Sequence, residues 1–100
     1  MNDLKRLLTD HRRLRIPDFP DDDEFSEWVE ELIDVDAYYV GLISSLVEGG
    51  KVNLNKVVVN QMKSKLSLFK DCEDRQIYDE CAAFIKSLDR LGSAALAELN

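Results

Sequence analysis

Hydrophobic residues recur at alternating spacings of three and four through the stretch between Phe25 and Val47. One apolar stripe contains Phe25, Trp28, Leu32, Val35, Tyr39, Leu42 and Leu46. This spacing is typical of an α-helix that buries one face. A second apolar stripe, which starts at Val29, lies about 100° further round such a helix. The two stripes together predict a long central helix, at about residues 23–48, that packs between two neighbouring helices.

A shorter helix is predicted before the central one, over about residues 2–15. Its leucines lie on one face, and its arginines gather near the end, where cations interact favourably with the helix dipole. Pro17 and Pro20 follow this segment. Because a proline disfavours helical backbone in the residue before it, the sequence predicts an irregular connection here. Asp22 or Asp23 can then cap the central helix.

Two more helices are predicted in the second half of the chain. Asn53 or Asn55 can cap the first of them, which extends to about residue 71. The other begins near residues 74–75, and Gly92 is a position where it can break. No convincing pair of strands occurs. The predicted fold class is therefore all-α: one helical domain that spans all 100 residues, built as a four-helix antiparallel bundle.

The composition indicates where in the cell the protein is located and which cofactor or metal sites it can contain. The net charge is −7, and 45% of the residues are hydrophobic, which is enough to bury a core without disulfide bonds. Cys72 and Cys81 form no CxxC or Cys/His pattern, so we expect reduced thiols. The N-terminus is charged where a secretion signal needs an apolar region, and no uncharged run is long enough to cross a membrane. We therefore expect a cytoplasmic protein with no cofactor and no metal site.

Charge is strongly segregated along the chain. Residues 1–15 contain five Lys and Arg residues, whereas residues 16–50 contain eleven Asp and Glu residues and no Lys or Arg. Opposite the apolar stripes of the central helix, acids surround a tyrosine, as in an aromatic anchor with a charged rim. The candidate partner-binding residues are Asp21, Asp22, Asp23, Glu24, Glu27, Glu31, Asp34 and Tyr38. We expect this face to bind a basic protein surface or to mediate self-association, and not to contact nucleic acid. The alternative is a solvated helix face.

Asp36 is a carboxylate inside the apolar arc of the central helix. A buried carboxylate needs a partner, because burying it unpaired is energetically costly. Lys65, inside the apolar arc of the following helix, is one candidate, and His11 and the arginines of the first helix are others. Alternatively, Asp34 or Asp36 caps a new helix at a break in the central one. We accordingly expect Asp36 and Lys65 to be buried polar residues.

Catalytic patterns are few. His11 is the only histidine, which excludes a di-iron bundle with two Glu-x-x-His pairs and limits acid–base catalysis. Arg6 and His11, in the stretch RLLTDH, resemble the R-x4-6-H motif of helical nuclease domains that cleave RNA without a metal ion. In those domains the motif lies late in the domain and a polar residue usually follows the arginine, where this chain has Leu7. Phosphate-binding glycine loops, nucleophilic serine motifs and calcium-binding loops do not occur in the sequence.

The sequence favours a non-enzymatic acidic helical module that binds other proteins, such as an inhibitor or an adaptor that docks on a basic surface. Binding of this kind weakens steeply as salt is added. One alternative is a small homo-oligomeric assembly protein, for which a doubled mass in solution is expected. The other is a metal-independent ribonuclease-like helical domain.

Overall fold

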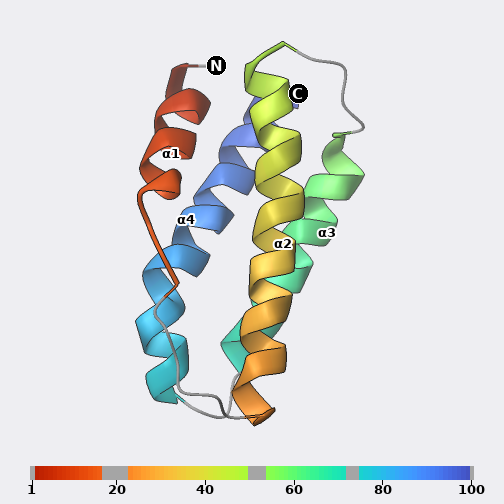
Figure 1. The fold of residues 1–100 in the computed structure, drawn as a ribbon. Coiled ribbons are helices and arrows are strands. Elements are labelled where there is room, and N and C mark those ends of the chain that lie inside the picture. The colour runs from red at the N-terminus through yellow and green to blue at the C-terminus, as the bar shows by residue number, and fades with distance from the viewer. Residues whose placement is uncertain (1, 17–22, 50–53, 72–74, 100) are drawn as a thin grey trace.

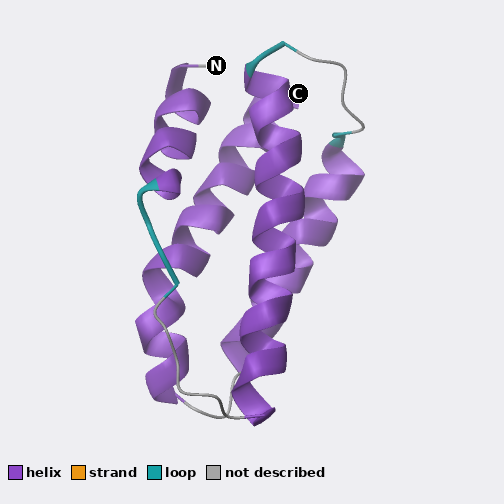
Figure 2. Cartoon of the chain, in the orientation of Figure 1, coloured by secondary structure: helices purple, strands orange, loops and turns teal. Residues whose placement is uncertain are grey.

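The protein folds as a bundle of four helices. The computed structural model describes residues 2–16, 23–49, 54–71 and 75–99. These residues form α1 (Asn2–Arg12), α2 (Asp23–Val47), α3 (Lys56–Leu68) and α4 (Arg75–Leu99), with a 3₁₀ turn, η1 (Phe69–Asp71), after α3. Successive helices run in opposite directions (Figure 1), and the described part of the chain contains no strand (Figure 2). The prediction of an all-α four-helix antiparallel bundle is confirmed.

Helix α2 is continuous, as its two apolar stripes predict. Its bounds, Asp23–Val47, agree with the expected residues 23–48, and neither Asp34 nor Asp36 interrupts it. Gly49 follows the helix with a backbone φ of +79°, a left-handed conformation that glycine adopts without a steric penalty. Neither α2 nor any other helix of the described residues is long and apolar enough to cross a membrane.

The ends of α1 and α3 are set by local hydrogen bonds. Helix α1 stops at Arg12, earlier than predicted, and the amide of Leu14 then donates to the carbonyl of His11 at 3.0 Å. At the start of α3, the amide of Val58 donates to Oδ1 of Asn55 at 3.0 Å. Asn55 is thus the observed cap, while the other candidate lies outside the described residues.

Helix α4 packs against all three of the other helices, most extensively against α1 and α3. Helix α2 packs against α1 as well as α4, so α4 shares the central position with α2. Each helix contributes to one apolar core, represented by Leu8 of α1, Leu32 of α2, Met62 of α3 and Leu88 of α4, each at most 4% exposed. The core therefore joins all four helices, and α4 has the largest part in it.

Gly92 does not break α4, contrary to the sequence-based expectation. The helix continues through it, and Gly92 is buried where α4 passes α3. A Cβ atom at this position would lie 2.5 Å from Cε of Met62 and 3.4 Å from Cγ of Lys63. Glycine costs a helix interior only about 1 kcal/mol relative to alanine. Here its missing side chain allows the two helices to approach closely, which explains why it stands inside a helix.

The buried face of α3 differs from the predicted one. Lys65 is exposed, so the prediction that it is a buried polar residue is wrong. Val57 and Leu68 are also exposed, at 65% and 68%. Hydrophobic residues occur around most of α3, so sequence spacing does not determine which face is buried. Met62 is buried with its terminal methyl group beside Gly92 of α4, while Lys65 lies in solvent.

Candidate functional site

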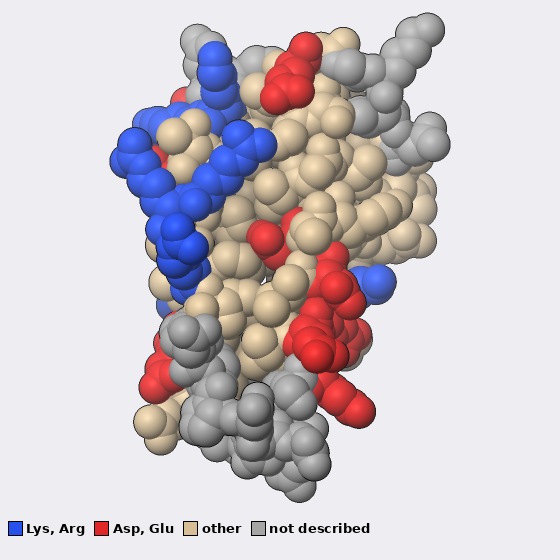
Figure 3. Space-filling view, viewed as in Figure 1, with Lys and Arg blue, Asp and Glu red and all other residues tan. Residues whose placement is uncertain are grey.

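The candidate partner-binding site is the exposed side of the first half of α2. Glu27, Glu30, Glu31 and Asp34 are all exposed there. None of them forms an ion pair with another residue that the structure describes. The space-filling view shows the acidic side chains gathered along this part of α2 (Figure 3). The sequence-based prediction that Glu27, Glu31 and Asp34 lie on the outer side of the helix is confirmed.

Two hydrophobic side chains are exposed beside these acids. Tyr38 is 59% exposed and Ile33 is 47% exposed. The ring of Tyr38 meets the ring of the buried Tyr39 edge to face, with 4.9 Å between centroids and 82° between planes. This contact supports Tyr38 at the surface. Exposure of Tyr38 was predicted, whereas Ile33 belongs to the second apolar stripe and its exposure was not.

Tyr39 anchors this part of α2 in the core. It is only 3% exposed, and its burial, with a smaller contribution from neighbouring Tyr38, raises the pKa of its hydroxyl group. The hydroxyl therefore stays protonated at neutral pH. Tyr39 thus acts as a neutral core residue, and Tyr38 alone of the pair is presented to solvent.

The remaining predicted acids precede this stretch. Asp21 and Asp22 lie outside the described residues. Asp23 and Glu24 stand in the first turn of α2, where a negative charge interacts favourably with the helix dipole, but their side chains are outside the described set. We therefore define the acidic face as Glu27, Glu30, Glu31, Asp34 and Tyr38.

The basic side of α1 lies on the same side of the molecule as the acidic face (Figure 3). The exposed cations of this segment are Lys5, Arg6, Arg12, Arg13 and Arg15. Arg6 lies 3.9 Å from Asp3 within α1, and Arg12 donates a hydrogen bond to the hydroxyl of Ser44 in α2. No described cation of this segment pairs with the acidic face. In Figure 3 uncharged surface separates this basic segment from the acidic side chains of the first half of α2.

His11 joins three helices through its side chain. It is 2% exposed, with Nε2 2.6 Å from Oδ1 of Asp36 in α2 and Nδ1 2.8 Å from Oγ of Ser87 in α4. Its ring also packs against Phe84, with centroids 4.7 Å apart. Because a carboxylate only accepts hydrogen bonds, we assign a proton to Nε2. The polar atoms of this buried ring are thus fully paired.

Asp36 has the partner that a carboxylate in this position needs. Its side chain is 27% exposed, so it is half-buried, and it pairs with His11 and not with Lys65. The partner expected for Asp36 is found in His11, one of the alternatives, whereas the predicted burial of Asp36 is only partial. Ser87, the third member, was missed because a single serine on a helix carries no spacing signal.

The Ser87, His11 and Asp36 side chains contain the residue types of a catalytic triad, but their surroundings do not fit acyl transfer. A catalytic serine needs open access and backbone N–H groups that stabilise an oxyanion. Ser87 stands in the middle of α4, where the backbone N–H groups are used within the helix. His11 is buried. We therefore assign the three side chains a structural role in holding α1, α2 and α4 together.

Arg6 and His11, the pair that resembles a ribonuclease motif, do not converge. Arg6 has a side chain that is 70% exposed, whereas His11 is enclosed in the bundle with both ring nitrogens occupied. Five positions apart on a helix, the two side chains point about 140° away from each other. The geometry therefore offers no shared cleft for RNA at this pair.

Among the described residues, no group of three or more His, Cys, Asp and Glu side chains is placed to hold a metal ion. Comparison of the chain with protein-family models, with curated proteins and with solved structures found no match.

Proposed function

We propose that this protein is a non-enzymatic helical module that binds a basic protein surface through the acidic face of α2. The observation that carries this proposal is the exposure of Tyr38 beside acids that have no cationic partner in the described part of the chain. Large exposed hydrophobic side chains within a polar rim are typical of protein interfaces. An inhibitor or an adaptor would present such a face.

The two kinds of side chain have different roles in the proposed interface. Tyr38 is a rigid aromatic group that gains binding energy when a partner covers it, since tyrosine is enriched among the residues that dominate interface energetics. The acids select the partner and speed its approach, because complementary charge acts mainly on association rate and specificity. The net charge of −7 strengthens this selection. The expected partner therefore carries a basic surface with a hydrophobic residue or pocket at its centre.

A charge-reversal variant tests the proposal. Glu27→Lys, Glu31→Lys and Asp34→Lys together replace three exposed acids and leave the core intact. We expect capture of basic proteins from native lysate by the immobilised full chain to fall about tenfold or more, because attraction becomes repulsion. Quantitative mass spectrometry of the captured proteins, eluted in a salt gradient, measures this. Proteins captured by the wild type should elute as salt rises.

The matched control reverses three exposed acids elsewhere. Asp71→Lys, Asp79→Lys and Glu80→Lys change the net charge by the same amount at η1 and α4. This control should capture the same proteins as the wild type. Tyr38→Ala, which keeps all charges, should weaken binding by about 1–2 kcal/mol. Equal losses in both triple variants, or capture that is insensitive to salt, would contradict the proposal.

A second candidate function is self-association, and one observation favours it. The exposed cations of α1 and the acidic face of α2 lie on one side of the molecule (Figure 3). In a two-fold symmetric dimer that uses this side, the basic segment of each copy can lie against the acidic face of the other. The basic partner would then be a second copy of the chain.

A further inference from the structure

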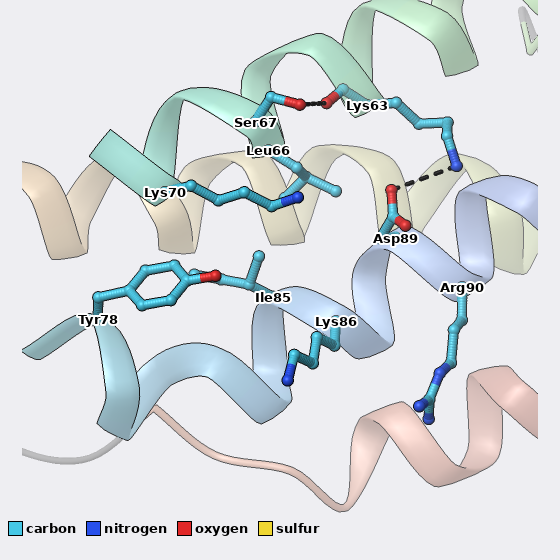
Figure 4. A pocket seen from close by; sticks show the side chains of 9 residues that line it. All are labelled: Lys63, Leu66, Ser67, Lys70, Tyr78, Ile85, Lys86, Asp89 and Arg90. Atoms are coloured by element: carbon cyan, nitrogen blue, oxygen red, sulfur yellow. Dashed lines mark hydrogen bonds and ion pairs between the residues drawn. The ribbon is translucent and has the colours of Figure 1, made fainter. Parts of the chain in front are cut away.

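A cavity of about 400 Å³ lies between α3 and α4 (Figure 4). Its floor is hydrophobic, formed by the buried side chains of Leu66 and Ile85. Tyr78 forms one wall. The cavity shares no residue with the acidic face, so the proposed docking function does not explain it. Its size is within the range of cavities that enclose small molecules.

The lining of this cavity is cationic, although the protein as a whole is acidic. Four lining residues, Lys63, Lys70, Lys86 and Arg90, are basic, and Asp89 is the acid among the described lining residues. Nζ of Lys63 lies 3.2 Å from Oδ1 of Asp89, so the charges of these two residues offset each other. The other three cations have no carboxylate partner within the described parts of the chain. Figure 4 shows Lys70 extending beside the hydrophobic floor, whereas the charged ends of Lys86 and Arg90 extend away from Lys70.

Tyr78 is held in position by neighbouring groups. The guanidinium carbon of Arg75 lies 4.7 Å from the centroid of the Tyr78 ring, a cation–π contact. Nη1 of Arg75 also donates a hydrogen bond to the carbonyl of Lys70 at 3.3 Å, which ties the start of α4 to η1. Figure 4 shows the side chains of Lys70 and Tyr78 extending alongside each other over Ile85. The aromatic wall and one cation are thus placed together before any ligand binds.

We propose that this cavity binds a small organic anion with a flat hydrophobic body, such as an aromatic carboxylate. Leu66, Ile85 and Tyr78 contact the body, and the ammonium group of Lys70 pairs with the anionic group. The hydrophobic floor contributes affinity by burial, while the charge of Lys70 selects for an anion. A neutral compound of the same shape lacks the second contribution, and a simple anion lacks the first.

The test uses three probes on the full-length chain at low salt. They are 2-naphthoate, its neutral amide 2-naphthamide, and inorganic phosphate. Protein-observed NMR titration gives both the affinity and the affected residues. We expect 2-naphthoate to shift the amides of residues 63–70 and 78–90 and to bind about threefold more tightly than 2-naphthamide, because one exposed ion pair adds modestly to affinity. Phosphate should bind more weakly than 2-naphthoate.

Removing the charge of Lys70 locates the anion. Lys70→Gln should weaken 2-naphthoate about threefold and leave 2-naphthamide unchanged. The matched control is Lys65→Gln, at an exposed lysine of α3 that does not line the cavity. This control should bind 2-naphthoate as tightly as the wild type does. Both positions are exposed, so both variants should fold, which circular dichroism checks.

Several outcomes would overturn the inference. One is that 2-naphthoate and 2-naphthamide bind with equal affinity, and another is that the control lysine variant weakens 2-naphthoate as much as the test variant does. The others are NMR shifts confined to α1 and the absence of any shift at millimolar 2-naphthoate. Phosphate binding as tight as that of 2-naphthoate would show that the hydrophobic floor has no role. None of these measurements depends on the acidic face, so the inference and the proposed function can fail separately.

Discussion

His11 shows how a single buried polar residue is accommodated in a hydrophobic bundle. An imidazole with a protonated Nε2 has one donor that must be used, and the carboxylate of Asp36 accepts it at 2.6 Å. Ser87 occupies the other nitrogen. Every buried side-chain nitrogen and oxygen within the described residues has a hydrogen-bond partner. Loss of one partner therefore leaves a group that neither protein nor solvent satisfies.

Asp36→Ala should lower the free energy of unfolding by about 1–3 kcal/mol, because the buried Nε2–H of His11 loses its acceptor. Asp36→Asn keeps an oxygen acceptor and should cost less. Asp34→Ala is the control, since it makes the same change in helix propensity at an exposed position of α2. Urea unfolding followed by circular dichroism measures all three. Equal stability of the two alanine variants would show that the His11 hydrogen bond contributes nothing.

At this scale the sequence predicts which residues need a partner better than it predicts the partner. A carboxylate in an apolar arc is unusual, so Asp36 is recognisable from spacing alone. Whether its partner comes from α1 or α3 depends on the packing of helices, which one sequence does not determine. Lys65 was therefore placed wrongly, and Ser87 was missed.

At the scale of helices, two glycines inside helices have opposite roles. Gly41 lies on the exposed side of α2, and a Cβ atom there would meet no atom within 4 Å. Gly92 lies in the contact between α3 and α4, where the same atom would meet Met62. The first glycine only lowers helix propensity, whereas the second leaves room for the side chain of Met62.

Gly41→Ala should raise the free energy of unfolding by about 0.5–1 kcal/mol, because alanine is the better helix former and no atom is displaced. In Gly92→Ala the terminal methyl of Met62, a buried side chain, must move, which offsets the same gain. We expect Gly92→Ala to be at least about 1 kcal/mol less stable than Gly41→Ala in urea unfolding. Equal stabilisation by the two substitutions would show that the contact is looser than described.

Element boundaries follow from sequence where the pattern is strong. Helix α2 was predicted almost to the residue, since two complete apolar stripes and a terminal glycine mark it. Helix α4 was predicted except at Gly92, because a glycine that breaks a helix and one that permits a close contact look identical in sequence. The buried face of α3 was predicted partly wrongly: Val57 and Val58 were expected to be buried, but these valines are consecutive with Val59, and only Val59 is buried.

At the scale of the whole molecule, charge is the property most readily read from sequence. The segregation of bases into the first fifteen residues and of acids into the following stretch places two opposite charges on one side of the bundle (Figure 3). The cationic cavity between α3 and α4 was not predicted. Its residues come from two helices whose relative rotation the sequence leaves open.

Self-association through this side can be tested by mass. If the second candidate function holds, light scattering should give twice the monomer mass at about 20 mM salt and the monomer mass at about 0.5 M, because screening weakens the exposed charge pairs. The acidic-face triple lysine variant should be monomeric alone. Mixing it with an Arg13→Glu and Arg15→Glu variant should restore dimers, because the basic segment of the first variant then faces the unchanged acids of the second, and the new Glu residues of the second face the new Lys residues of the first. Restored mass would identify the contact, and a monomer at low salt would exclude this candidate.

The pairing of His11 with Ser87 has a further consequence for folding order. The two residues are 76 positions apart, so docking α1 on α4 closes a loop that contains most of the chain. Helices α3 and α4 are consecutive, so their docking closes a much shorter loop and costs less conformational entropy. Helix α1 has only 11 residues, too few to be stable as a helix on its own in water. We therefore expect the α3–α4 hairpin to form first and α1 to become helical only as it docks. Local unfolding should then begin by detachment of α1, which would expose His11 and the apolar groove that α1 covers.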